Sequence, residues 1–140
     1  MDTIEKDSTQ TIKYPSDEED FGWIAMGWRI PGKLSENYKD VHSLSILGSY
    51  LSSTSISPLK KAFVDLPEPY STDVDIDILM NAEPAITIDF ENVPIDKMDE
   101  IEDKFKETIA NIYTEGIDKE RLHTIIKRMV LTRKINLENR

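Results

Sequence analysis

Hydrophobic residues recur along the chain with two different periods, and these periods predict where strands and helices lie. Three segments alternate apolar and polar positions as strands do: residues 21–30, 72–80 and 85–91. Four segments repeat apolar residues every three or four positions as amphipathic helices do: residues 37–52, 58–65, 94–115 and from 118 onward. The order strand, helix, helix, strand, strand, helix, helix predicts an α+β fold, with helices packed on one face of a largely antiparallel sheet.

The first strand differs from the other two in its pattern of apolar residues. Residues 21–30 are largely apolar on both faces, so we expect this strand in the centre of the sheet. Gly22 and Gly27 predict a bulge or a close backbone approach within it.

The second and third strands are each apolar on one face only. Asn81-Ala-Glu-Pro84 between them predicts an antiparallel hairpin. The face that we expect to be buried carries Val74, Ile76, Ile78, Ile86, Ile88 and Phe90. Asp73, Asp75 and Asp77 are expected to point outward, so the sheet has one face in water.

Capping residues predict where the helices begin and end. Ser57 is expected to accept a hydrogen bond from a free N–H of the short helix that Pro58 begins. Gly116 is expected to end the third helix, and Asp118 to cap the fourth. The buried side of that last helix is expected to carry Leu122, Ile125, Met129 and Leu137.

Composition limits the class of protein. The chain has 140 residues, the size of one ordinary domain, and 39% of them are hydrophobic. The absence of cysteine excludes disulfides, thiolate zinc sites and thiol nucleophiles, and it is compatible with a reducing compartment. No segment approaches the roughly 20 apolar residues of a membrane helix, so we expect no membrane partner. An acidic N-terminus without a secretory signal favours the cytoplasm over the mitochondrial matrix.

The chain is acidic, with a formal net charge of -10. Such a surface repels nucleic acid and attracts basic peptides, although acidity also serves solubility alone. Residues 1–20 are polar without a period and end in Ser16-Asp-Glu-Glu-Asp20. We therefore expect a flexible acidic lead-in over residues 1–20 and a folded domain over residues 21–140.

The residues that most often carry metal chemistry are sparse here. His42 and His123 lie on expected helices, and neither belongs to an H-E-x-x-H or H-x-x-E-H pattern. Residues 73–77 are similar to the start of a calcium loop, but Ile78 and Pro84 stand where that loop needs Gly and Glu. We expect these aspartates to form the solvated face of a strand.

Binding and nucleophile motifs are absent as well. The sequence contains no G-x-S-x-G elbow, no G-x-G-x-x-G and no phosphate-binding loop. Trp23, Trp28 and Arg29 could line a binding surface, but as strand residues we expect them to be core and sheet cover. From its own residues, the chain is expected to have no catalytic, no cofactor-binding and no metal-ligating residue.

Four stretches, taken in order, carry a family resemblance. They are Phe21–Arg29 with its Gly-Trp-Arg ending, the helix ending in Tyr50-Leu51, Ser57-Pro-Leu-Lys-Lys-Ala-Phe-Val64, and Phe90-Glu-Asn-Val-Pro94 leading to Gly116-Ile-Asp-Lys-Glu-Arg121. In this order the chain, from about Tyr14 to Arg140, resembles the pitrilysin/insulinase superfamily of zinc metallopeptidases. The likeness is closest to the presequence-protease-like branch and its cytosolic relatives.

The resemblance implies a non-catalytic role. Peptidases of this family are clam-shaped chambers of homologous α+β domains, and zinc is held in the first domain by H-x-x-E-H and a distant Glu. This chain resembles most of a later half-chamber domain, incomplete at its C-terminus, and has no position that matches those ligands. The resemblance implies a fragment of a zinc metalloendopeptidase-like protein that helps to enclose unfolded peptides and is inactive alone. Zinc would belong only to the catalytic domain of the parent enzyme, and the partners would be the parent's remaining domains or a homologous subunit.

Two other functions remain open from the sequence. One is a stand-alone module that binds a protein or peptide, the hairpin edge pairing with a partner's extended strand. The other is a catalytically dead subunit that completes the chamber of another chain.

Overall fold

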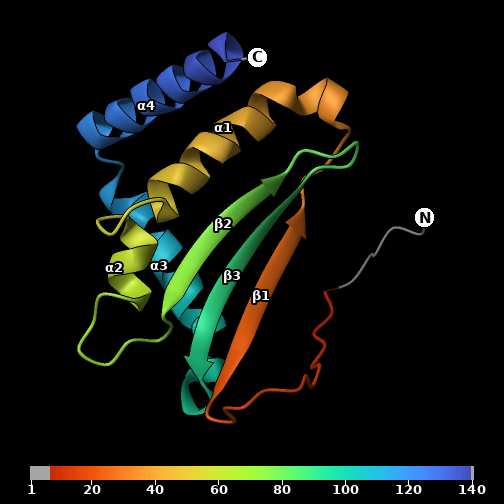
Figure 1. Ribbon diagram of the computed structural model, residues 1–140, viewed down its shortest axis with the longest axis vertical. Coiled ribbons are helices and arrows are strands. Elements are labelled where there is room, and N and C mark those ends of the chain that lie inside the picture. Colours follow the sequence, from red (N-terminus) through yellow and green to blue (C-terminus); the bar gives the residue numbers. More distant parts are fainter. Residues whose placement is uncertain (1–6, 140) are drawn as a thin grey trace.

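Three antiparallel strands, in the order β1-β3-β2, form the sheet on which the helices pack (Figure 1). The computed structural model describes residues 7–139. The strands are β1 (Phe21–Arg29), β2 (Asp73–Leu79) and β3 (Ala85–Pro94). The helices are α1 (Leu34–Ser52), α2 (Pro58–Phe63), α3 (Ile101–Glu115) and α4 (Lys119–Glu138), and a 3-10 helix, η1 (Ile95–Glu100), precedes α3. The predicted α+β fold with its antiparallel sheet is confirmed.

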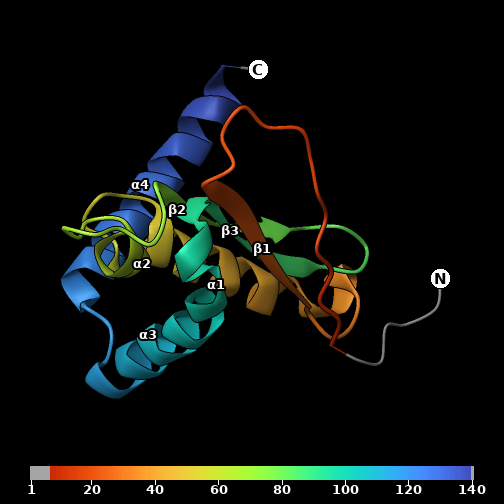
Figure 2. The same cartoon turned by 90° about the horizontal axis from the view of Figure 1, so that it is seen from below.

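The helices cover one face of the sheet. α1 and α3 lie below the same face in Figure 2. The burial predicted for the hairpin is confirmed at Val74, Ile88 and Phe90, which are 0–1% exposed. Ile76, Ile78 and Ile86, expected on the same buried face, are only half-buried. Phe90 is the centre of the core, with its ring 4.9 Å from that of Phe63 and 6.4 Å from that of Phe105.

The prediction that the first strand is central is wrong. β1 pairs only with β3, and β3 pairs on both sides, so that Met26, Ile88 and Ile76 lie in one row across the sheet. Although β1 is an edge strand, both of its faces carry apolar side chains. On the face away from the helices, Trp23 is exposed to solvent because no second layer covers it.

The expected irregularity near Gly22 is present, but the extra residue lies in β3. The register shifts between Gly22 and Ile24, where Trp23 faces two residues of β3, and Asn92 there has a φ of 48°. The close approach expected at Gly22 is confirmed, since a Cβ atom there would lie 2.9 Å from Met98 Cε. At Gly27 the corresponding distance is 3.7 Å, an ordinary contact, so the expectation of a close approach is wrong at that residue.

The caps of α3 and α4 are as predicted. Gly116 follows α3 with a φ of 86°, a conformation that glycine adopts without strain. The Asp118 carboxylate accepts hydrogen bonds from the backbone N–H groups of Glu120 and Arg121, both at 3.1 Å. These two residues therefore set the short connection between α3 and α4.

Two helix predictions are wrong in detail. An α-helix was expected from residue 94, but β3 continues to Pro94 because Val93 still pairs with Gly22, and η1 precedes α3. Ile125 is buried and Leu122 and Met129 pack against the core, whereas Leu137 is 61% exposed. Leu137 is exposed because the C-terminal half of α4 diverges from α1 (Figure 2).

The predicted lead-in lies only partly within the described residues. Residues 7–20 form no helix or strand and are exposed. Residues 1–6 and Arg140 lie outside the described part of the chain, so the division at residue 20 stays a prediction.

Replacing Phe90 with alanine is expected to lower the free energy of unfolding by about 3–5 kcal/mol, because a cavity would open between the rings of Phe63 and Phe105. Urea unfolding followed by circular dichroism measures this. Tyr113→Ala is the matched control, because Tyr113 is 91% exposed and its loss should change the free energy of unfolding by less than about 0.5 kcal/mol. Equal effects of the two substitutions would contradict this description of the core.

Candidate functional site

A polar network centred on Arg121 joins α4 to the turn between α1 and α2. Arg121 Nη2 donates to the carbonyl of Tyr50 at 2.7 Å and to Ser57 Oγ at 2.8 Å. Its guanidinium lies 4.5 Å from the centre of the Tyr50 ring. The Tyr50 hydroxyl in turn accepts a hydrogen bond from the backbone N–H of Asp118 at 3.0 Å. These contacts fix the ends of three helices relative to one another.

The predicted role of Ser57 as a side-chain cap is wrong. Ser57 is fully buried, and its Oγ accepts hydrogen bonds from the backbone N–H of Thr54 at 2.9 Å and from Arg121. It makes no capping bond to α2, because its oxygen is engaged by donors from the preceding turn and from α4. Pro58 begins α2 as predicted. No local sequence pattern indicates that Arg121, 64 residues away, is the partner of Ser57.

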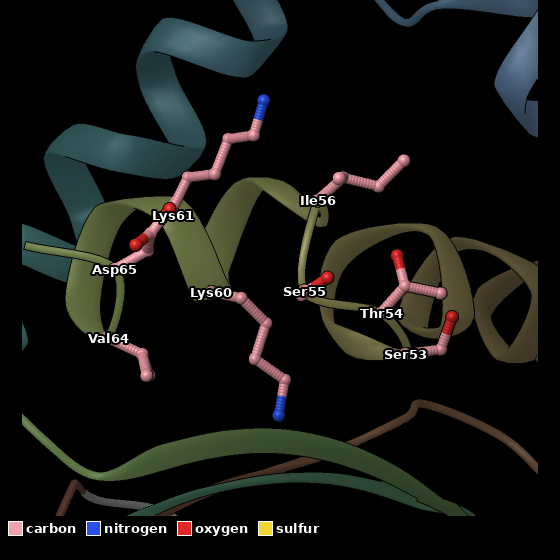
Figure 3. A pocket seen from close by; sticks show the side chains of 8 residues that line it. All are labelled: Ser53, Thr54, Ser55, Ile56, Lys60, Lys61, Val64 and Asp65. Carbon is pink, nitrogen blue, oxygen red and sulfur yellow. The ribbon is translucent and has the colours of Figure 1, made fainter.

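A surface hollow of about 560 Å³ lies beside this network (Figure 3). It is lined by Ser53, Thr54, Ser55, Ile56, Lys60, Lys61, Val64 and Asp65. Lys60 is ion-paired with Asp73 on β2, and Lys61 points in the opposite direction (Figure 3). No histidine lines the hollow, and its walls combine the hydroxyl groups of Ser53, Thr54 and Ser55 with the apolar side chains of Ile56 and Val64.

The two histidines lie on different helices, and neither lines the hollow. His42, on α1, stacks on Tyr38 with ring centres 6.1 Å apart, and His123 lies exposed on α4. Within residues 7–139, no three His, Asp or Glu side chains are grouped so that they could hold a metal ion. Nor is any helix of this part of the chain long and apolar enough to cross a membrane. That the chain has no catalytic, cofactor-binding or metal-ligating residue stays a prediction.

A perturbed pKa can mark a functional site, but the one at Lys106 has a structural cause. The Glu102 carboxylate accepts a hydrogen bond from Lys106 Nζ at 2.6 Å and raises the pKa of that amine. Both side chains are exposed on successive turns of α3. This is an ordinary surface ion pair on a helix.

The uncovered face of the sheet is acidic. Its charged residues, named here the acidic face, are Asp73, Asp75, Asp77, Asp89 and Glu91. Asp75 lies directly opposite Asp89, and Asp73 lies opposite Glu91. Like charges in facing positions repel each other, so this surface favours a positively charged partner.

Local partners relieve this repulsion only in part. Lys60 pairs with Asp73, and the Ser52 hydroxyl lies 3.2 Å from Asp75 Oδ1. The indole N–H of Trp23 donates to Asp89 Oδ1 at 3.3 Å. Asp75 and Asp77 are exposed, as predicted for a solvated strand face.

Trp23, Trp28 and Arg29 are exposed, so the prediction that they are core is wrong, whereas the predicted role as sheet cover fits Trp28. Trp23 is 53% and Trp28 is 44% exposed, on opposite faces of β1. Trp28 stacks on Phe105 at 5.9 Å and covers one margin of the core. The reason is again the position of β1, because an edge strand leaves both of its faces partly open.

The two edges of the sheet differ. At the edge of β2, Ser52 Oγ on α1 accepts a hydrogen bond from the backbone N–H of Ile76 at 3.2 Å. The pairing edge expected on the hairpin stays a prediction, and β1 forms the other edge of the sheet.

The chain matches a known protein family over most of its length. Residues 2–129 match the family model described as the peptidase M16 inactive domain. An uncharacterized protein of Caenorhabditis elegans is 28% identical over 142 residues, which cover 99% of this chain and 14% of that protein. An uncharacterized protein of Schizosaccharomyces pombe is 26% identical over 125 residues, which cover 89% of this chain and 12% of that protein. The chain thus spans less than a sixth of each of these relatives.

Replacing Arg121 with methionine keeps the length of the side chain but removes its hydrogen bonds. The free energy of unfolding should fall by about 1.5–3 kcal/mol, because Tyr50 O and Ser57 Oγ lose a charged donor. Urea unfolding measures the loss. Arg128→Met serves as the control, since Arg128 makes an exposed 3.4 Å contact with Ser53 and its loss should cost less than about 0.5 kcal/mol. A cost for Arg121→Met no larger than that of the control would refute the central role of Arg121.

Proposed function

The chain belongs to the peptidase M16 inactive-domain family, as its resemblance to the pitrilysin/insulinase superfamily predicts, and from that premise we propose that it is a non-catalytic part of a peptide-enclosing chamber. The observation that carries this proposal is the match of residues 2–129 to a domain described as inactive. It agrees with the absence, within residues 7–139, of any group of three side chains that could hold a metal ion.

Zinc, which the resemblance implies for the parent enzyme, does not fit the residues of this chain that the structure describes. A catalytic zinc site takes three protein ligands that converge on one point. His42 lies on α1 and His123 on α4, and no such group occurs within residues 7–139. In our proposal another domain of the parent metalloendopeptidase holds the metal, and this chain forms part of the wall of the peptide-enclosing chamber.

The acidic face supports a role in attracting peptides. Four of its five carboxylates form two facing pairs, on a chain whose net charge is -10. An uncovered surface of one sign draws ligands of the opposite sign toward it. We propose that the wall favours unfolded basic peptides.

Exposed apolar residues on α4 support contact with further domains or with a homologous subunit. Val130, Leu131, Ile135 and Leu137 are between 45% and 63% exposed. Large apolar groups gathered at one end of a helix are typical of an interaction surface. On this proposal residues 21–140 are the domain, residues 1–20 lead into it, and a cysteine-free chain of this kind works in the cytoplasm.

A stand-alone binding module is the second candidate, and the open edge of β1 favours it. Such a module would be stable and soluble alone, unfold cooperatively and bind a defined ligand. Folding only after flanking sequence is restored would favour the chamber wall instead. Co-purification with a metal-containing homologue would favour a catalytically dead subunit.

Removing charge from the acidic face should weaken the binding of basic peptides. The variant Asp75→Asn/Asp77→Asn/Asp89→Asn should bind a fluorescent Lys/Arg-rich unfolded peptide at least about three-fold more weakly than the unmodified chain, since each exposed charge pair contributes about 0.2–1 kcal/mol. Fluorescence anisotropy at low salt measures this, and an acidic peptide of equal length should not bind.

The matched control removes the same charge elsewhere. Asp103→Asn/Glu107→Gln/Glu115→Gln alters exposed residues of α3, away from the sheet face. It should leave the affinity for the basic peptide nearly unchanged. If both triple variants lose the same affinity, net charge alone is responsible and the acidic face is not a peptide-binding surface.

A further inference from the structure

We propose that the C-terminal half of α4, residues 130–138, docks into a groove of a partner protein surface that has carboxylates along its floor and apolar walls. This inference rests on the proposed contact of α4 with further domains or a homologous subunit, and it adds the chemistry of the partner. The argument uses the exposure of this half of α4, its charge, and the order of its side chains around the helix.

The chain itself does not cover this half of α4. Leu122, Ile125 and Met129 belong to or pack against the core, whereas every residue from 130 to 139 is exposed. Figure 2 shows the C-terminal half of α4 diverging from α1. The last turns of α4 therefore present their whole circumference to solvent in the described part of the chain.

The composition of these turns gives them little stability of their own. Val130, Thr132 and Ile135 are β-branched and Asn136 favours turns, so the segment has a low intrinsic helix propensity. Most of the stability of a protein helix comes from packing one of its faces against a neighbour. A partner that covers these turns would supply that packing.

The exposed side of this half carries three rows of side chains. Successive residues of an α-helix are turned by about 100°, so residues seven apart lie on nearly the same line. The middle row holds positive charge, and the rows on either side of it are apolar. The middle row is Lys127 and Lys134, and the flanking rows are Val130 with Leu137 and Leu131 with Ile135.

The charge of α4 is opposite to that of the rest of the chain and selects an acidic partner. α4 carries six basic and two acidic residues, on a chain whose net charge is -10. Among residues 7–139, the ion pairs lie elsewhere, between β1 and the hairpin turn, between α2 and β2, and within α3. Lys127 and Lys134 thus keep charges that a carboxylate can neutralise. At physiological ionic strength the Debye length is about 8 Å, so repulsion of an acidic partner by the distant acidic face is screened.

The order of the rows favours a protein groove over a membrane surface. A helix that lies in a membrane interface buries one continuous apolar face and keeps its charges on the opposite side. Here both apolar rows can be buried together only if the lysine row between them is buried too. A groove with carboxylates on its floor and apolar walls meets all three rows, in the way that grooves bind amphipathic helices.

Fluorescence anisotropy of a labelled helical peptide, titrated with the full 140-residue chain at 0.15 M salt, tests the proposal. The peptide carries one row of Glu between two rows of Leu, and we expect it to bind. Lys127→Glu/Lys134→Glu should weaken binding at least about ten-fold, because two attractions become repulsions. Val130→Gln/Leu137→Gln keeps the charge but removes one apolar row, and should weaken binding at least about five-fold.

The matched control reverses the same charge elsewhere. Lys33→Glu/Lys39→Glu alters two exposed lysines at the start of α1 and should change the affinity less than about two-fold. A peptide with Ala in place of every Leu should not bind, because its charge is also repelled by the chain as a whole. Circular dichroism should show that each variant keeps the helical content of the unmodified chain.

Several results would overturn the proposal. These are no binding of the Glu/Leu peptide, equal binding of the Glu/Ala peptide, equal losses in the two lysine variants, and tighter binding to phosphatidylserine vesicles than to the peptide. The last result would identify α4 as a membrane-binding helix. Changes to α4 leave the acidic face intact, so binding of a basic peptide there should persist in every α4 variant. Failure of this inference and failure of the proposed peptide-enclosing wall therefore give different results.

Discussion

The guanidinium of Arg121 reaches from α4 to the last turn of α1 and to the residue before α2. It donates hydrogen bonds to the carbonyl of Tyr50 and to the hydroxyl of Ser57. With this turn held, α2 places Phe63 against Phe90, and the end of α1 sets Ser52 against the backbone of β2. One charged side chain thus connects the helical layer with both the core and the β2 edge of the sheet. Removing it would release these parts together.

Local patterns predicted most of the elements because they depend on neighbours in the sequence. The alternation of β2 and β3, their antiparallel pairing, the glycine at the end of α3 and the Asp118 cap all follow from residues a few positions apart. Strand order was not predictable in this way. Apolar residues on both faces of β1 are as compatible with an exposed edge as with a buried centre, and only the pairing with β3 distinguishes them.

The candidate surfaces likewise combine features that local patterns predict with features that depend on residues distant in the sequence. The outward position of Asp73, Asp75 and Asp77 was predictable from alternation. That Asp73 lies opposite Glu91 and Asp75 opposite Asp89 depends on the register of the hairpin. The partner of Ser57 lies 64 residues away, and no local rule selects it. The exposure of Trp23 and Trp28 likewise depends on the outer position of β1. Long-range pairing decides what these residues do.

In our account the chain acts by binding peptides and neighbouring domains and does not catalyse a reaction itself. The acidic face attracts partners of positive charge, so added salt should weaken their binding. A zinc-dependent peptidase assay on the purified chain, with unfolded peptides as substrates, tests this account most directly. It predicts no turnover above buffer with added zinc. Turnover that elutes with the chain on gel filtration, stops with a chelator and is lost in His42→Ala/His123→Ala would contradict it.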